Sequence, residues 1–503
     1  MPGIKPFEFT RQALAQGSNQ AVITKDFWGI ENIPWTRPDV LEKTLPVFRE
    51  LGIGILGRNC LDWATIEPNP PRNSKHFYHW QALDREFELY HQHGFRIQAV
   101  VRCRSSWATE ITERELTGPA GSPPKEAYWR DWGKLIFELV ERYDGDGFKD
   151  AFKMDYPILK IVSLQGEIEF PSHWKKYGGT PENYTRLLVS AYEEAKKAWP
   201  GVMIARAGTS VGDMFDSEPD STLIARLMDR TPRSRNVFDF LRYSLGHPDG
   251  FDLFGIHANR SYRGIAPFVA WIRQHMKNRG YSKPIFIEDA SSIMGGRAGI
   301  HERVSSDSAA QERQLSYEIH KVLDQGKQHP RYGWARTELY RLQAETVVKK
   351  CTVALASNVK GLMLTGYVDN PKSTFYQLRR GGLIDSDIYL ETGDIRRSLK
   401  PSYYALRLFI EKVQGAKEAV EKLQYESDVY AFRFMRANRP FYILWCEGGD
   451  RSIELPTMAD KVRITPINTS YGQLVPRQEV MATNNGKVLM RLNATPTFVE
   501  ETR

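Results

Sequence analysis

Eight short apolar runs, separated by amphipathic segments with helical spacing, recur between about Trp28 and Val413. This alternation is typical of repeated βα units, whose strands form a parallel sheet. Eight such units predict a (β/α)8 TIM barrel, in which the functional site lies where the strands end. The predicted strands are Phe27–Ile30, Ile53–Arg58, Phe95–Val101, Ile158–Leu164, Val202–Arg206, Phe251–Ile256, Pro284–Ile287 and Val359–Leu364.

Helix signals between these runs support the barrel. Thr180, Pro181 and Glu182 supply an N-cap, a first-turn proline and an acid that complements the helix dipole. Gly94 is placed to end the helix before the third strand, because glycine readily adopts the left-handed cap conformation. A further helix is predicted at about 338–357, before the eighth strand.

The periodicity changes after residue 412. Tyr430, Phe432 and Phe434 alternate with other residues, and several short strand-like runs follow, separated by Asn, Gly, Asp and Pro. This pattern predicts a small antiparallel β-sandwich, and the alternation of its aromatic residues favours a core role over substrate binding. We therefore predict a barrel of catalytic type over residues 1–413 and a C-terminal sandwich over residues 414–503.

Composition narrows the possible partners. The chain of 503 residues is 41% hydrophobic and 26% charged, as in ordinary globular proteins. Its net charge of +8 comes without a long Lys/Arg block or a recognisable nucleic-acid motif, so we predict no nucleic-acid partner. No apolar stretch is long enough to span a membrane, so no membrane partner is predicted. The sequence leaves the oligomeric state open, and predicts a cytoplasmic protein if the chain is complete or a secreted one if a signal peptide has been removed.

Four cysteines are spread along the chain without a C-x-x-C pair, and most lie in apolar contexts. This spacing favours buried free thiols over disulfides or a metal site. No metal and no organic cofactor is predicted. The cysteines are Cys60, Cys103, Cys351 and Cys446.

Two of the predicted strands end in carboxylates. The fourth strand runs into Glu167, followed by Glu169, and the seventh runs into Glu288 and Asp289. A glycosidase needs two such acids, since one protonates the leaving oxygen while the other attacks the sugar or activates water. Strand-end carboxylates also form ion pairs with arginine, and the barrel context favours catalysis over that alternative.

The order of several segments resembles that of the clan A retaining glycoside hydrolases, especially β-xylosidase-like members with a C-terminal sandwich. The likeness covers almost the whole chain. The segments are Arg58-Asn-Cys-Leu-Asp-Trp63, Ile66-Glu-Pro68, Trp80-Gln-Ala-Leu-Asp84, Phe251-Asp-Leu-Phe-Gly-Ile-His257, Lys283-Pro-Ile-Phe-Ile-Glu-Asp289, Gly382-Leu-Ile-Asp-Ser-Asp387 and Lys400-Pro-Ser-Tyr-Tyr-Ala405.

The resemblance implies roles for these residues. Glu167 falls on the acid/base position, and a neighbouring carboxylate would raise its pKa. Asp289 falls on the nucleophile position, with Arg58 as the cation that keeps it ionised. The remaining candidates for substrate binding are Trp107 and Tyr367, which could stack on sugar rings or pack in the core, together with Gln165, Glu169, His257 and Asn259.

Two departures from the family pattern bear on activity. Gly166 stands where the family has an asparagine that holds the sugar 2-hydroxyl, and Gln165 could replace that amide only through a local distortion of the strand. Asp289 is one methylene shorter than glutamate. Four outcomes stay open: attack by Asp289, use of Glu288 after a bulge, inversion through a wider gap, or lost catalysis.

The leading prediction is therefore a retaining hydrolase of β-linked oligosaccharides, polysaccharides or glycosides, and the sugar is not specified. The rival is a barrel with impaired catalysis that serves as a carbohydrate-binding or scaffold protein. Long connections at about 213–250 and 291–337 follow the fifth and seventh strands, where loops shape substrate sites in barrels or simply pack on the surface.

Overall fold

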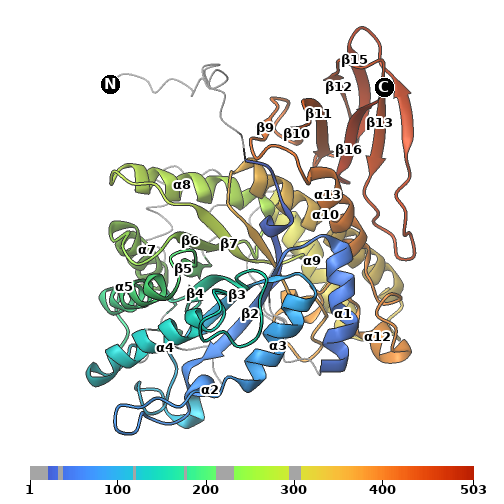
Figure 1. The fold of residues 1–503 in the computed structure, drawn as a ribbon. Helices are drawn as coiled ribbons and strands as arrows, with labels where there is room; N and C mark the ends of the chain where they lie inside the picture. The colour runs from blue at the N-terminus through green and yellow to red at the C-terminus, as the bar shows by residue number, and fades with distance from the viewer. Residues whose placement is uncertain are drawn as a thin grey trace.

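The computed structural model describes residues 21–31, 38–116, 121–170, 172–174, 178–210, 232–293 and 308–502. The described part of the chain forms a barrel followed by a C-terminal β-domain (Figure 1). Residues 213–231 and 294–307 of the two predicted long connections lie outside the described residues, and the other parts of both connections are described.

The barrel is closed, with its strands in sequence order and parallel to their neighbours. All eight predicted strands are confirmed, with ends that differ by a few residues from the apolar runs. Its strands are β1 Trp28–Glu31, β2 Ile55–Asp62, β3 Arg96–Arg102, β4 Leu159–Leu164, β5 Met203–Thr209, β6 Leu253–His257, β7 Ile285–Ala290 and β8 Leu362–Thr365.

Helices connect the strands and surround the barrel (Figure 1). Several are short, and α10 is the longest of the described ones. The described α-helices are α1 Pro38–Leu51, α2 Trp63–Ile66, α3 Gln81–Gln92, α4 Trp129–Glu141, α5 Pro181–Ala198, α7 Pro232–Gly246, α8 Ile265–Lys277, α9 Ser308–Asp324, α10 Tyr332–Ala356, α11 Tyr376–Arg379, α12 Ser386–Thr392 and α13 Pro401–Val413. Short 3-10 helices lie at Lys25–Phe27, Glu113–Glu115, Glu126–Tyr128 and Tyr262–Gly264.

The helix ends follow the signals in the sequence. The Thr180 side chain accepts a hydrogen bond from the Asn183 backbone N–H at 3.2 Å, and Pro181 occupies the first turn of α5. Gly94 follows α3 with φ of 78°, a left-handed conformation that costs glycine little. Both predicted helix boundaries are confirmed.

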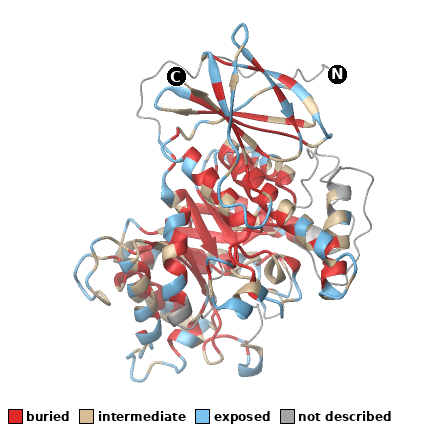
Figure 2. Cartoon of the chain, turned by 90° about the vertical axis from the view of Figure 1, so that its right-hand side faces the viewer, coloured by how far each residue is buried: buried red, intermediate tan, exposed pale blue. Residues whose placement is uncertain are grey.

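The barrel interior is apolar at one level and polar at the next. Six side chains from alternate strand positions pack together inside the barrel, and they are Ile55, Ile161, Ala205, Leu253, Phe286 and Met363. Side chains of the intervening positions, directed outward, join the core beneath the helices. Buried residues are accordingly concentrated on the barrel strands in Figure 2.

The C-terminal domain contains a six-stranded sheet of order β14-β13-β16-β11-β10-β9 and a two-stranded sheet, β12-β15. Residues alternate between buried and exposed along several strands, as predicted (Figure 2). Helix α13 ends at Val413, and the first strand of the C-terminal domain, β9, begins at Glu421. The exact domain boundary between them stays a prediction. The strands are β9 Glu421–Lys422, β10 Val429–Arg436, β11 Arg439–Cys446, β12 Arg451–Pro456, β13 Lys461–Pro466, β14 Glu479–Ala482, β15 Lys487–Leu492 and β16 Thr497–Thr502.

The six-stranded sheet has two different buried faces. One face packs with the two-stranded sheet in a small core of its own that includes Val429, Leu444 and Leu455. The other face, which includes Phe432 and Trp445, belongs to the same hydrophobic core as the barrel. The sandwich is therefore continuous with the barrel core along one side.

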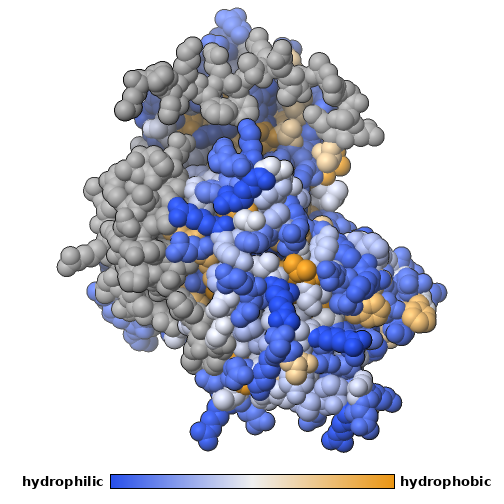
Figure 3. All heavy atoms as spheres, turned by 90° about the vertical axis from the view of Figure 1, so that its left-hand side faces the viewer, coloured by the Kyte–Doolittle hydropathy of each residue, from blue (hydrophilic) through white to orange (hydrophobic). Residues whose placement is uncertain are grey.

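The described surface is mostly hydrophilic on the face shown in Figure 3, where hydrophobic residues form small separate spots. Among the described residues, no helix has the length and apolar character needed to cross a membrane. The four cysteines are free thiols. Three of them are buried as predicted, whereas Cys60 is exposed.

Candidate functional site

Glu288 occupies the polar level inside the barrel. Its Oε1 accepts a hydrogen bond from the Ser163 hydroxyl at 2.6 Å, and its Oε2 accepts one from the Gly208 backbone N–H at 2.6 Å. Gln98 donates in turn to Ser163 at 2.9 Å. Glycine at position 208 permits this approach, because a Cβ there would lie 2.7 Å from Glu288 Oε2 and 2.2 Å from the His257 ring. Burial raises the pKa of Glu288 despite these hydrogen bonds.

Glu167 lies just beyond the end of β4, where the backbone departs from strand geometry. Gln165 and Glu167 have φ values of 68° and 50°, in the left-handed region that costs non-glycine residues about 1 kcal/mol or more. The Glu167 backbone N–H donates to the Gly208 carbonyl of β5 at 3.2 Å. The Glu167 side chain remains 28% exposed, so a ligand can reach it.

His257, at the end of β6, contacts both strand-end acids. Its Nδ1 lies 3.2 Å from Glu167 Oε1 and 3.9 Å from Asp289 Oδ2. Burial favours the neutral imidazole, but the hydrogen bond to Glu167 and the charges of Asp289, Glu167 and Glu288 raise the pKa of His257 to about 10. His257 is therefore an imidazolium at neutral pH.

The charge of His257 reverses the predicted shift at Glu167. Burial raises the pKa of Glu167, but the hydrogen bond and charge of His257, with His173 and Ser210, lower it below its ordinary value overall. The sequence predicted a raised pKa from a neighbouring carboxylate. That prediction is wrong, because the hydrogen bond and charge of His257 outweigh the effect of burial.

Asp289, the predicted nucleophile, is positioned by the segment that follows β6. Asn259 donates from Nδ2 to Asp289 Oδ2 at 2.8 Å, and its own Oδ1 accepts from the Ser291 backbone N–H at 3.0 Å. Oδ1 of Asp289 is buried and has no hydrogen-bond partner among the described residues. Burial raises the pKa of Asp289, although His257 and Asn259 act in the opposite direction. Asn259, predicted to bind substrate, thus orients this carboxylate.

The separation of the two strand-end carboxylates is bounded by their common neighbour. Glu167 Oε1 and Asp289 Oδ2 lie 3.2 and 3.9 Å from the same His257 nitrogen, so they are at most about 7 Å apart. Retaining glycosidases separate their carboxyl groups by about 5 Å and inverting ones by about 6.5–9.5 Å. The bound accommodates retention and the lower part of the inverting range.

Glu31, at the end of β1, is a fourth carboxylate in this group and was missed by the sequence analysis. Asn59 donates to Glu31 Oε1 at 2.7 Å, and Glu31 is only 6% exposed. Burial, with the charge of Asp289, raises the pKa of Glu31 well above its ordinary value. Its position directly after the first apolar run, Phe27–Ile30, was the available signal, parallel to that of Glu167 after the fourth run.

Arg58 lies on the outward side of β2, contrary to the predicted contact with Asp289. Its Nε donates to Glu86 of α3 at 3.1 Å, and its Nη1 donates to the Asn59 carbonyl at 2.7 Å. Successive strand residues face opposite sides, so Asn59, and not Arg58, is directed at the carboxylates.

The two predicted stacking aromatics are differently placed. Tyr367 is 2% exposed and packs edge-on against Phe48 of α1, so its ring is covered and unavailable to a sugar. Trp107 is partly buried between Trp63 and Tyr128, and its indole N–H donates to the Glu67 carbonyl at 3.0 Å. These contacts give Trp107 a packing role on the rim.

Gln165 and Glu169 are both buried near the end of β4. The distortion required for Gln165 exists, but its Oε1 faces Gly121, where a Cβ would lie 2.2 Å away. Glu169 Oε1 accepts from the Thr209 hydroxyl at 2.6 Å and from the Ser210 backbone N–H at 2.8 Å. Glu169 thus ties the segment after β4 to the end of β5. At Gly166 a Cβ would meet nothing within 4 Å.

Lys350 of α10 fastens the ends of β6 and β7 beside the site. Its buried ammonium donates to the carbonyls of Ala258 and Ser291 at 2.6 and 2.7 Å. Ala258 directly follows His257, and Ser291 lies two positions beyond Asp289. The lysine therefore sets the relative position of these two site residues.

Replacing Lys350 with methionine is expected to lower the free energy of unfolding by about 3 kcal/mol, because two buried carbonyls lose a charged donor. Urea unfolding measures this loss. Lys360→Met is the matched control, since Lys360 is 41% exposed and pairs with Glu418, a surface contact that contributes less than about 1 kcal/mol. Equal losses in the two variants would contradict the role given to Lys350.

One acidic group among the described residues has metal-ligand spacing. Carboxylate oxygens of Asp144, Asp146 and Asp150 lie within 4.8 Å of one another in the connection from α4 to β4. That connection is at the opposite end of the barrel from the strand-end carboxylates. Burial, with the neighbouring acids, raises the pKa of Asp144 to about 6.

Comparison with known proteins gives similarity in structure alone. No protein-family model matches the sequence, and no curated protein matches it. Among solved structures, a family 39 glycoside hydrolase from Bacteroides cellulosilyticus WH2 aligns with a TM-score of 0.61 and 13% identity, over 96% of this chain and 82% of that one. A conserved exported protein from Bacteroides fragilis aligns with 0.58 and 10% identity, over 95% and 98%. A monomeric β-xylosidase from Caulobacter crescentus CB15 aligns with 0.57 and 13% identity, over 96% and 98%. The chain therefore shares the fold of these three structures, which in this chain is a (β/α)8 barrel followed by a C-terminal β-sandwich.

Proposed function

We propose that the protein is a glycoside hydrolase acting on β-linked carbohydrate, with Glu167 as acid/base and Asp289 as nucleophile. One observation carries the proposal: a single histidine nitrogen contacts carboxylates from the ends of β4 and β7. Paired carboxylates at that spacing are the chemical requirement of glycoside hydrolysis. The substrate would be an oligosaccharide, a polysaccharide or a smaller glycoside.

The reaction would proceed in two displacements. Asp289 attacks the anomeric carbon while the bond to the leaving oxygen breaks, and Glu167 gives its proton to that oxygen. Water then attacks the same carbon and releases Asp289, while Glu167 takes the proton of the water. Two inversions return the original configuration.

His257 supplies the proton that Glu167 needs at the start. The lowered pKa of Glu167 leaves it ionised in the resting protein, whereas the raised pKa of His257 keeps that ring protonated. Transfer from Nδ1 across the 3.2 Å contact converts Glu167 into the acid and His257 into a neutral imidazole. Exclusion of water by a bound sugar favours this transfer, because it removes charge from both partners.

Glu288 is a weaker candidate for the nucleophile. Both of its carboxylate oxygens accept short hydrogen bonds from barrel residues, and only 4% of the residue is exposed. An oxygen held in this way is a poorer nucleophile than Asp289 Oδ1. Glu288 instead contributes negative charge that supports the His257 imidazolium.

A panel of aryl β-glycosides tests the proposal. Release of the aryl group by the wild-type protein, together with a first-formed β-anomer in the NMR spectrum, is the expected result. A first-formed α-anomer would show that the enzyme inverts the anomeric configuration instead of retaining it. If no member of the panel releases its aryl group while sugar binding is retained, the protein is a carbohydrate-binding protein and not a glycosidase.

A further inference from the structure

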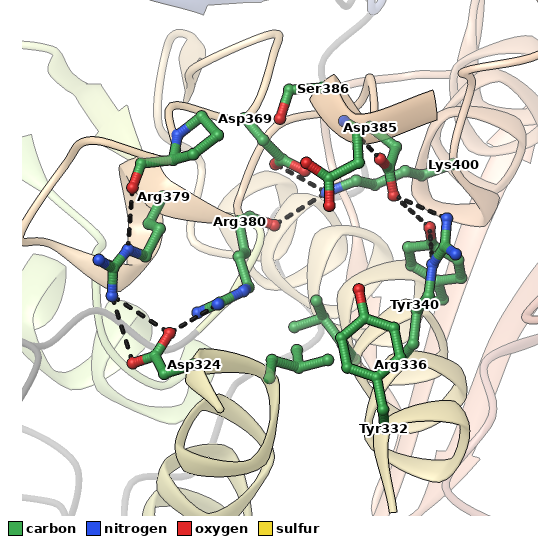
Figure 4. Close-up of a pocket in the computed structure, with 14 residues that line it drawn as sticks. Asp324, Tyr332, Arg336, Tyr340, Asp369, Arg379, Arg380, Asp385, Ser386 and Lys400 are labelled. Carbon is green, nitrogen blue, oxygen red and sulfur yellow. Dashed lines mark hydrogen bonds and ion pairs between the residues drawn. The ribbon is translucent and has the colours of Figure 1, made fainter. Parts of the chain in front are cut away.

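A polar cavity of about 390 Å³ lies beyond the barrel strands, between the end of α9, the start of α10 and the chain that follows β8 (Figure 4). Its volume falls in the range of small-molecule sites, about 300–1,000 Å³. The residues assigned to catalysis do not line it. It is therefore a separate hollow in the described part of the molecule.

One side of the cavity is formed by an arginine pair that shares a carboxylate. Arg379 Nη1 lies 3.1 Å and Arg380 Nη2 lies 2.6 Å from Asp324 Oδ1. The Arg379 Nε also donates to the Pro371 carbonyl at 3.2 Å. These contacts hold both planar guanidinium groups at the wall (Figure 4).

The opposite side holds two more carboxylates with their own partners. Asp369 accepts from the buried Lys400 ammonium at 2.7 Å. Asp385 accepts from Arg336 at 3.2 Å and from the Tyr340 hydroxyl. The two sides therefore present fixed acceptors and donors toward one space (Figure 4).

The charges of the lining cancel. Arg336, Arg379, Arg380 and Lys400 face the carboxylates of Asp324, Asp369, Asp385 and Asp387, which makes four groups of each sign. Each of the four cations already has a carboxylate partner. A phosphate or a uronic acid would have to displace such a carboxylate, whereas a neutral ligand would not.

The remaining lining suits a ligand that has both apolar faces and hydroxyl groups. The Tyr332 hydroxyl points into the space between the two charged groups (Figure 4). Leu323 and Leu339 add apolar surface. Sugar hydroxyls both donate and accept, so they match carboxylate acceptors and guanidinium donors, and their C–H faces pack on aromatic and aliphatic groups.

We propose that this cavity binds a neutral saccharide unit as a second carbohydrate site. The choice of a saccharide among neutral hydroxylated ligands rests on the proposed function. The cavity wall is joined to the candidate active site, since Gln343 donates to the Arg380 carbonyl at 2.7 Å and to the Ser292 hydroxyl at 3.2 Å. Ser292 lies three residues after Asp289, so an occupied cavity adjoins the segment that follows β7.

Calorimetric titration with neutral hexasaccharides tests the site. Xylohexaose, cellohexaose and mannohexaose are titrated into the Glu167→Gln protein, which would not consume them. Adding Tyr332→Ala or Asp387→Ala is expected to weaken binding of the preferred probe by about tenfold, the effect of losing one good contact. Tyr425→Ala, in the sandwich and away from the cavity, is the matched control and is expected to leave binding unchanged. The milder Tyr332→Phe and Asp387→Asn are measured beside them, with melting temperatures, so that loss of folding is recognised.

Two results would overturn the inference. One is that no hexasaccharide binds, or that binding is unaffected by all four cavity substitutions. The other is that inorganic phosphate or galacturonate binds in competition with the hexasaccharide and is lost in the same variants. Aryl glycoside turnover by Tyr332→Ala with Glu167 intact separates this inference from the proposed function: binding lost with turnover retained supports both. If the wild-type protein shows no turnover but hexasaccharide binding still depends on the cavity residues, the second site is supported and the proposed enzymatic function is rejected.

Discussion

Glu167→Gln is expected to lower kcat for an aryl β-glycoside with a poor leaving group by about a thousandfold. The amide keeps the shape of the side chain but cannot deliver or take a proton, and general acid–base catalysis contributes about 10²–10⁴ in rate. The His257 contact would also lose its charged partner. Steady-state kinetics over a series of leaving groups measures the effect, which should shrink as the leaving group becomes more acidic.

Glu182→Gln is the control for this change. Glu182 is exposed in the first turn of α5 and is not among the residues that contact Glu167 or Asp289, so its replacement should leave kcat unchanged. Wild-type kcat in the Glu167→Gln protein would remove Glu167 from the mechanism. An equal loss for all leaving groups would point to a role in binding instead of proton transfer.

His257→Gln is expected to change how stability depends on pH. The pKa of His257 is raised from 6.5 to about 10 in the folded protein, so the folded state holds its proton more tightly than the unfolded chain. The resulting stabilisation is fully present below about pH 6.5 and is lost as the pH rises toward 10. At about 1.4 kcal/mol for each pH unit, the loss in the wild-type protein is at most about 5 kcal/mol. The variant lacks this contribution.

Urea unfolding at intervals between pH 6 and 10 measures the difference between the two proteins. Taking the difference removes the contributions of groups that titrate in this range and do not interact with His257. His247→Gln, at an exposed position after α7, serves as the control and should follow the wild-type curve. Parallel curves for wild type and His257→Gln would show that His257 carries no proton at neutral pH.

The barrel could be predicted because its signal is local and repeated. Each strand is an apolar run of several residues, and helix ends are marked by residues such as Thr180 and Gly94. Strand ends were less accurate, since hydrogen bonding to neighbours extends β2 to Asp62 and β5 to Thr209, beyond their apolar runs. In the sandwich, β14 is mostly exposed and lacks the alternation that marked its neighbours.

The sequence predicted which residues form the candidate site better than it predicted which way their side chains face or how their pKa values shift. Strand-end position was enough to bring Glu167, His257 and Asp289 together. Whether Arg58 or Asn59 faces inward depends on the phase of the strand, which one residue reverses. The pKa of Glu167 depends on which charged group is nearest, and that is fixed by contacts between residues distant in the sequence.

The shared core between barrel and sandwich has a consequence for cooperativity. Tyr262, five residues beyond His257, donates to Glu447 of the sandwich at 2.6 Å and receives the Trp445 indole N–H at 3.3 Å. Lys349, next to Lys350 on α10, binds the same Glu447 at 2.8 Å. Loss of the sandwich would expose apolar side chains of the shared core. It would also remove Glu447 from Lys349 and Tyr262, close to the segment that follows β6. We therefore expect the barrel and the sandwich to unfold together, with the sandwich helping to maintain the geometry around His257.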